Sequence, residues 1–370
     1  MHQPPSFPKG TYLLMALITA YMLFFTVAAT EITAFIAIAL PIAFALAFMR
    51  SPALAALIGI PAVFGFFYSN SILTVATVVS VIFAIGMGAA VMLHTKPIIP
   101  ILMGALAYGA AVIYTKDLLI SAYMGLFLLC AVALAVLLSK KVSRVSAILG
   151  TSILFLIAIA VPFLISLYQD YGALSADTFS KFLSDLRDVA LGAYLEGIEI
   201  LNEEMRAAMT KELFHSVFDA ILSLAPAFLV IAACVVGFFA HMLALSICRR
   251  SGYARTFPLQ AQVFCMSKVS AIVFIVALVL PILGLGKSDT AHVISVTAEN
   301  INLMLMPAFL LVGGFGLLAL LRKFRGCLNI WVFMALIFFI PSIFAIAIYP
   351  LAIFGAIITL RTPSLNTTNP

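Results

Sequence analysis

Long runs of apolar residues alternate with short polar segments along the chain. A helix needs about 20 apolar residues to cross a membrane, within a range of about 17–25. About eleven runs meet this requirement, with 8–12 as the range, and each predicts one span. The spans lie near residues 11–30, 32–49, 52–68, 71–93, 97–114, 118–139, 146–168, 220–247, 269–286, 301–321 and 328–348. A further run, 351–360, follows Tyr349 and Pro350 and is too short to cross, so we expect a re-entrant or interfacial segment there.

The runs are continuously apolar, which favours helices over barrel strands, because barrel strands alternate apolar and polar residues over roughly 10 positions. Backbone polar groups in hydrocarbon must also be hydrogen-bonded within the protein, and a helix satisfies them locally. Composition agrees, since 65% of the 370 residues are apolar and only 9% are charged, whereas a soluble domain carries roughly 25% charged residues. The predicted fold class is an all-α, polytopic transmembrane helical bundle.

Lysine and arginine residues are distributed unevenly between the predicted loops. With a cytoplasmic N-terminus, thirteen of the twenty lie in cytoplasmic loops, and only Lys116 and Lys287 lie in short external loops. Cationic residues resist translocation, and short loops show this bias best. The pattern therefore predicts a cytoplasmic N-terminus. It also accounts for the net charge of +6, so we expect no nucleic-acid partner.

The segment 170–219 departs from this pattern, with ten of the fourteen acidic residues and four basic ones. Its apolar residues recur at steps of three and four, which is typical of an amphipathic helix. Asp177 is a candidate N-cap, and Gly192 and Gly197 are expected to divide the segment into two helices. We interpret it as an extracytoplasmic helical insert, either a lid or hairpin over the bundle or a helix packed on it. The predicted organisation is 1–169, N-terminal transmembrane hairpins; 170–219, the acidic insert; and 220–370, a C-terminal transmembrane bundle.

Ionisable side chains are nearly absent from the centres of the spans. The candidate site residues are four polar side chains at or just inside the ends of spans. Glu299, Asn300 and Asn302 lead into the tenth span. An unpaired amide in apolar surroundings is unfavourable, so the two asparagines are expected to bond to another helix, to water or to a ligand. Glu31 lies at the external end of the first hairpin, as either a solvated turn carboxylate or a fourth ligand-binding residue.

The sequence offers no catalytic residues, metal site or cofactor site. No nucleophile–base pair can be assembled, and the histidines lack metal-binding spacing. The five cysteines lie in or beside apolar runs, which is typical of packed residues. Three clusters of small residues are expected to let helices approach closely: Gly86 and Gly88; Gly104, Ala105 and Gly109; and Gly313, Gly314 and Gly316, called here the 313–316 cluster. Seven prolines are expected to kink or break spans: Pro41, Pro61, Pro162, Pro226, Pro281, Pro307 and Pro341.

The chain from Arg249 onward resembles the YybS-like family of bacterial predicted membrane proteins, whose function is unknown. The matching elements are a basic linker with Phe257 and Pro258, the run from Glu299 to Asn302, the run Gly313-Gly314-Phe315-Gly316, the run Arg322-Lys323-Phe324-Arg325, and a last span closing on Gly355 and Arg361. This family is grouped by fold similarity with substrate-binding membrane subunits of vitamin transporters and with the rod-shape protein MreD.

The resemblance implies a multi-pass protein of the bacterial cytoplasmic (inner) membrane whose transporter-like bundle binds or transports a small solute or lipid-like ligand. Glu299, Asn300, Asn302 and Glu31 would then lie near its external mouth, under the 170–219 segment. The alternative is a non-transporting scaffold for envelope or cell-shape assembly, in which a membrane partner protein docks on the acidic insert. An enzyme acting on lipids is a third alternative, and the absence of catalytic motifs argues against it.

Overall fold

The computed structural model describes residues 7–67, 69–199, 210–253, 257–258, 264–281, 289–323 and 341–361. All regular secondary structure in these ranges is helical. Six of the helices are long and apolar enough to cross a membrane, and five further apolar helices are shorter. The expected all-α, polytopic membrane fold is therefore confirmed.

The chain forms two compact units that are each discontinuous in sequence. Unit 1 comprises Met1–Ile159 and Ala232–Phe264, and unit 2 comprises Ala160–Ile231 and Cys265–Pro370. Two of the three boundaries fall inside helices, α7 (Arg144–Tyr171) and α10 (Lys211–Arg250), and the third follows Phe264, after the end of α10. These units are defined by packing in space, and the three consecutive segments expected from sequence stay a prediction.

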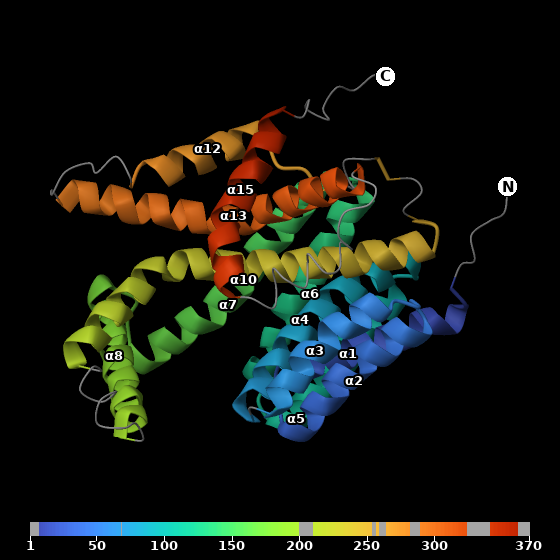
Figure 1. Cartoon of the computed structure of the whole chain (residues 1–370). Helices are drawn as coiled ribbons and strands as arrows, with labels where there is room; N and C mark the ends of the chain where they lie inside the picture. Colours follow the sequence, from blue (N-terminus) through green and yellow to red (C-terminus); the bar gives the residue numbers. More distant parts are fainter. Residues whose placement is uncertain are drawn as a thin grey trace. The chain divides into compact units, whose positions relative to one another are not determined.

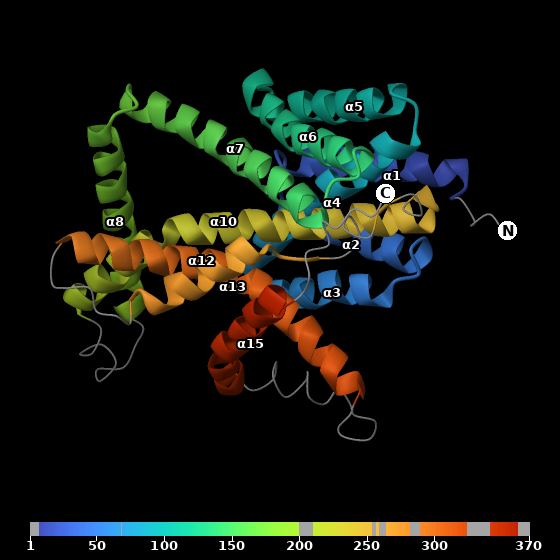
Figure 2. The same cartoon turned by 90° about the horizontal axis from the view of Figure 1, so that it is seen from above.

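Unit 1 is built around α4, which matches an expected span. Its helices are α1 (Lys9–Phe25), α2 (Glu31–Ala47), α3 (Pro52–Phe67), α4 (Ser69–His94), α5 (Ile98–Thr115) and α6 (Leu118–Ser139), with the first part of α7 and the last part of α10. Helix α4 packs against α1, α2, α3, α5 and α6 (Figures 1 and 2). Its most apolar stretch is 67% buried, against 17–33% for the other five long apolar helices, so α4 is the central helix of this unit.

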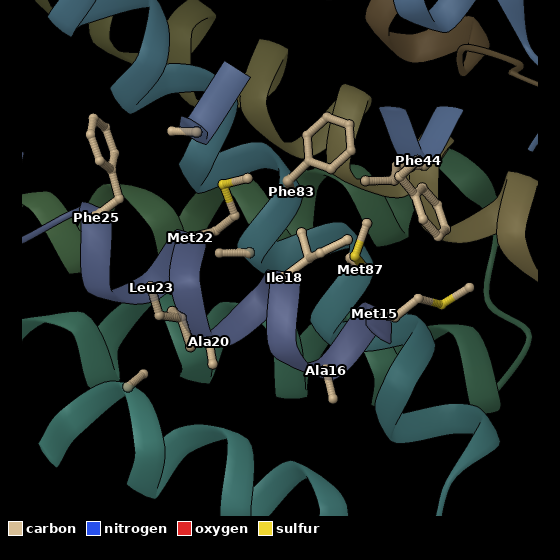
Figure 3. Close-up of a cluster of buried hydrophobic side chains, with 14 of the residues drawn as sticks. Met15, Ala16, Ile18, Ala20, Met22, Leu23, Phe25, Phe44, Phe83 and Met87 are labelled. Carbon is tan, nitrogen blue, oxygen red and sulfur yellow. The ribbon is translucent and has the colours of Figure 1, made fainter. Parts of the chain in front are cut away.

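Large apolar side chains from α1 and α4 fill the centre of unit 1 (Figure 3). Met15 and Met22 of α1 and Met87 of α4 are fully buried, and Phe83 is nearly so. Gly86 of α4 permits close packing on its other side, because a Cβ atom there would lie 2.6 Å from the Ala240 carbonyl oxygen of α10. The expected role of this glycine in helix approach is confirmed.

In unit 2, the last part of α7 is followed by the helix that the acidic segment predicts, α8 (Ala176–Glu199). Gly172, with a left-handed φ of 76°, lies in the turn between α7 and α8. The expected division of the segment at Gly192 and Gly197 is wrong, because α8 continues through both positions. Each glycine lowers helix propensity by only about 1 kcal/mol relative to alanine, and tertiary packing outweighs this.

Side chains of α8 contact the start of α10. Arg187 forms an ion pair with Asp219, and the rings of Tyr194 and Phe214 lie 5.0 Å apart. Helix α10 begins at Lys211 within the acidic segment and continues without a break to Arg250.

The C-terminal part of unit 2 contains α12 (Lys268–Val279), α13 (Asp289–Lys323) and α15 (Pro341–Arg361). The expected separate segment 351–360 is wrong, because α15 runs through Tyr349 and Pro350 as one helix of 21 residues. Proline removes one backbone hydrogen bond, and breaking the helix would expose more unbonded groups to hydrocarbon. Most of the expected span 328–348 falls on residues 324–340, which lie outside the described residues.

The prolines expected to disturb spans fall into two groups. Pro41, Pro61, Pro162, Pro226 and Pro307 lie inside helices that continue on both sides. Pro281 lies beyond the end of α12, and Pro341 is the first residue of α15, where its missing N–H costs nothing.

Helices α13 and α15 cross at glycines (Figures 1 and 2). A Cβ atom on Gly313 would collide with the Leu351 carbonyl oxygen, and one on Gly355 would collide with the Phe309 carbonyl oxygen. Gly314, the next residue, faces open space. Within the 313–316 cluster, Gly313 therefore has the predicted packing role and Gly314 does not. The sequence alone does not distinguish these two glycines.

Substituting Gly313→Ala should therefore destabilise the protein, because the added methyl group meets backbone rather than a flexible side chain. Overpacking of this kind costs about 1–3 kcal/mol. Thermal unfolding of the detergent-solubilised protein measures the effect. Gly314→Ala is the matched control and should leave the midpoint unchanged or slightly raised; equal losses in the two variants would contradict the crossing.

Candidate functional site

The three site residues expected on α13 do not share one face of the helix. With 3.6 residues per turn, Asn300 and Asn302 project about 200° apart. Glu299 is exposed, and its carboxylate accepts a 3.3 Å hydrogen bond from the Ser295 hydroxyl of the same helix. The structure therefore does not bring these three side chains together into a single cluster.

Asn300 joins α13 to α10 beside the mid-helix Pro226. Its Nδ2 group donates to the Ser223 carbonyl oxygen (2.9 Å), and its Oδ1 atom accepts from the Ala227 N–H (3.2 Å). These two backbone groups are four residues apart, so in a regular helix they bond to each other. Nδ2 also donates to the Val296 carbonyl oxygen of its own helix (2.9 Å). The amide is satisfied by helix–helix bonding, which is the first of the alternatives predicted for it.

Asn302 and Glu31 occupy different environments. The Oδ1 atom of Asn302 is buried without a hydrogen-bond partner among the described residues, so ligand binding by Asn302 stays a prediction. Glu31 belongs to unit 1, where it is exposed in the first turn of α2. A carboxylate in that turn is stabilised by the helix dipole, and Thr30 and Thr33 complete the N-terminus with a capping box.

A different feature of unit 1 has the geometry of a binding site. A pocket of about 700 Å³ lies where the end of α2 and the start of α3 meet the last turns of α10. Three arginines line it: Arg50, Arg249 and Arg250. Two serines, Ser51 and Ser246, supply hydroxyl groups, and the remaining lining residues are apolar.

Local sequence signals place each polar group of this pocket. Arg50 lies between α2 and α3 in the left-handed conformation, with φ 49°, and the Ser51 hydroxyl accepts a 3.3 Å hydrogen bond from the Leu54 N–H at the start of α3. Arg249 and Arg250 form the last turn of α10, where cations are favoured by the helix dipole. Arg250 also donates to the Met49 carbonyl oxygen, which ties the end of α10 to the end of α2.

Unit 1 contains almost no negative charge to neutralise these arginines. Its sequence holds ten lysines and arginines against two acidic residues, Glu31 and Asp117. Glu31 begins α2 and Arg50 follows its end, so about 25 Å of helix separates them. Asp117 caps the start of α6. Within the described residues, the only ion pair is Arg187 with Asp219, in unit 2.

In the sequence, Arg50, Arg249 and Arg250 indicate membrane topology and do not stand out as binding residues. Each stands at a helix end beside a predicted cytoplasmic loop, which is the common place for such residues. Arg50 and Arg250 are 200 positions apart, and nothing in the sequence indicates that they meet. Their assignment to the same side of the membrane was the one available signal.

The described residues contain no group of three or more histidine, cysteine or acidic side chains that could hold a metal ion. His94, the last residue of α4, contacts two neighbouring side chains: its Nε2 atom lies 2.6 Å from the Ser251 hydroxyl, and Tyr12 stacks on its ring at 5.3 Å.

The helical fold and the apolar helices define an integral membrane protein of the polytopic class. Residues 99–357 match the family described as Predicted membrane protein (DUF2232), and the chain belongs to this family. No curated protein and no solved structure matches the chain. The fold-level similarity to vitamin-transporter subunits and MreD therefore stays an expectation.

The Asn300 bridge predicts unequal effects for the two asparagines of α13. Asn300→Leu removes three hydrogen bonds and leaves the Ser223 and Ala227 backbone groups beside Pro226 unsupported. We expect a loss of about 0.6–2 kcal/mol, the range seen for interhelical hydrogen bonds in membranes. Asn302→Leu removes no hydrogen bond found among the described residues and should be neutral or stabilising. Thermal unfolding of both variants measures the difference in stability. A larger loss of stability for Asn302→Leu than for Asn300→Leu would contradict the bridging role of Asn300.

Proposed function

We propose that this protein resides in the bacterial inner membrane with its N-terminus in the cytoplasm and binds a small solute or lipid-like ligand. The observation that carries the proposal is the arginine-lined pocket of unit 1, with a volume of about 700 Å³. Small-molecule sites commonly have volumes of about 300–1,000 Å³ and combine apolar walls with a few polar groups. None of Glu31, Glu299, Asn300 and Asn302 lines this pocket, so the proposed ligand position differs from the one that the sequence suggested.

The charge pattern supports access to the pocket from the cytoplasm. Arg50, Arg249 and Arg250 belong to loops or helix ends that the distribution of cationic residues assigns to that side. The exposed arginines therefore lie at the level of the headgroups and the cytoplasmic water, where charge is not penalised as it is in hydrocarbon. Both a soluble metabolite and a membrane amphiphile can reach a site at this depth.

Ligand binding in the pocket is tested by screening vitamins, metabolites and lipids for a rise in the unfolding temperature of the purified protein. A ligand at 100 times its Kd stabilises the folded state by about 2.7 kcal/mol. Met242→Trp should abolish the shift, because Met242 lines the pocket and the larger side chain fills it. No shift with any compound, or a shift that Met242→Trp leaves intact, would refute binding at this site.

A second candidate function is a membrane scaffold, and one observation favours it. Among the exposed apolar side chains of helix α8 are Phe179 (42% exposed), Leu186 (42%) and Val189 (72%). Their spacing of seven and three residues places them on one face of the helix, in the strongly acidic segment 170–219. Such a face is suited to a partner protein with an apolar patch bordered by cationic residues.

The scaffold function predicts a discrete covalent adduct from a photo-crosslinking residue at Val189 in native membranes. Ser184 lies on the opposite face of α8 by helical periodicity and is also exposed. A crosslinker at that position is the matched control and should give no adduct of the same mass. Identical patterns from the two positions, or no adduct from Val189, would count against a partner on this face.

A further inference from the structure

We infer that the pocket of unit 1 takes a phosphate-bearing amphiphile, with its phosphate at the arginines and its apolar chain along α10. The inference rests on the proposed ligand-binding function and names the chemical class of the ligand. It draws on three properties of the pocket: the state of its arginines, the absence of competing carboxylates, and the order of its lining residues along the helix.

Two of the three arginines are available to an anion. Arg50 and Arg249 are exposed, and neither has an ion-pair partner among the described residues. Arg250 already donates to the Met49 carbonyl oxygen, and a guanidinium group retains further N–H donors after one such bond. Guanidinium groups match phosphate oxygens in bidentate geometry and are less strongly hydrated than lysine ammonium groups, so arginine clusters favour phosphate.

The charge of unit 1 favours an anionic ligand over a neutral one. Arg144 lies close enough to Arg249 for the two positive charges to repel each other, so Arg144 adds to the positive potential beside the pocket. The two carboxylates of the unit stand at the starts of α2 and α6, whereas the arginines follow the end of α2 and close α10. An anion in the pocket therefore meets several cations and no carboxylate of unit 1, and a surplus of one sign raises the local concentration of such a ligand.

The lining residues of α10 change from apolar to cationic along one face. Phe239 and Met242 come first, followed by Ser246 and then Arg249 at the end of the helix. Their steps of three and four residues place them in one row, about 15 Å long from Phe239 to Arg249. Met49 and Leu54 extend the apolar part from the α2–α3 side. An anionic head with an attached apolar chain matches this order, whereas inorganic phosphate would leave the apolar part unfilled.

The test uses the full chain in non-ionic detergent micelles and a short-chain phosphatidylglycerol with a fluorophore on its acyl chain, followed by fluorescence anisotropy. Saturable binding is expected for the wild-type protein. Arg50→Gln combined with Arg249→Gln should weaken binding about tenfold or more, because charge-assisted hydrogen bonds are lost. Arg250 is left in place because it also joins α10 to α2. Arg50→Lys with Arg249→Lys, which keeps the charge, should weaken binding less.

The matched control is Lys140→Gln with Lys141→Gln. These exposed residues follow α6 in the loop before α7, are assigned to the same side of the membrane, and do not line the pocket. The control removes the same number of positive charges as the Arg50→Gln, Arg249→Gln variant. It should change binding by less than about twofold, since exposed charges at a distance are screened. If the Lys140→Gln, Lys141→Gln control weakens binding as much as the Arg50→Gln, Arg249→Gln variant, then the net positive charge of the protein rather than the pocket attracts the lipid. That result would overturn the inference.

Competition identifies the source of the phosphate group. Unlabelled short-chain phosphatidylglycerol should displace the probe, short-chain phosphatidylcholine should do so less well, and pyrophosphate should not do so at the same concentration. Displacement by pyrophosphate at the concentration that suffices for phosphatidylglycerol would overturn the amphiphile and point to a soluble phosphate compound. Probe binding that ignores both arginine variants but is blocked by Met242→Trp would overturn the phosphate class while leaving pocket binding intact. Binding unaffected by Met242→Trp would remove both proposals.

Discussion

The backbone of this protein must find its hydrogen-bond partners inside the chain, because most of the surrounding medium offers none. With 65% of its residues apolar and 9% charged, the sequence has little polar surface for water. Helices α10 and α15 accordingly continue through Pro226 and Pro350. Buried hydroxyl groups follow the same constraint: Thr19, Thr151 and Thr359 each donate to the carbonyl oxygen four residues earlier in their own helix.

The same constraint separates the polar residues into two kinds. Inside unit 2, Asn300 serves the backbone, because its amide bonds to the N–H and C=O groups of α10 beside a proline. At the helix ends, charged side chains reach the headgroups and water, so they carry a smaller energetic penalty than in hydrocarbon and can serve as binding groups. In unit 1 the carboxylates stand at the starts of α2 and α6, and the arginines gather where α2 and α10 end. A pocket that is both cationic and partly apolar results from this separation.

Membership of a family of predicted membrane proteins is consistent with binding and with scaffolding, so the choice between them rests on particular surfaces. The pocket of unit 1 offers an open, partly apolar site whose charged side chains are all cationic. Helix α8 offers an exposed apolar face in an acidic segment. The two features lie in different units and involve different residues, so one protein can use both.

The sequence by itself determined the helical class, the positions of the first six helices, and the amphipathic helix of the acidic segment, because all three depend on local apolar periodicity. It did not determine the continuity of α8 past Gly192 or of α15 past Pro350, since packing and backbone bonding outweigh local propensity there. Only the tertiary structure separated Asn300 from Asn302 and Gly313 from Gly314, because neighbours on a helix point in different directions. It alone brought Arg50 beside Arg249 and Arg250, since contacts between residues that are 200 positions apart leave no trace in one sequence.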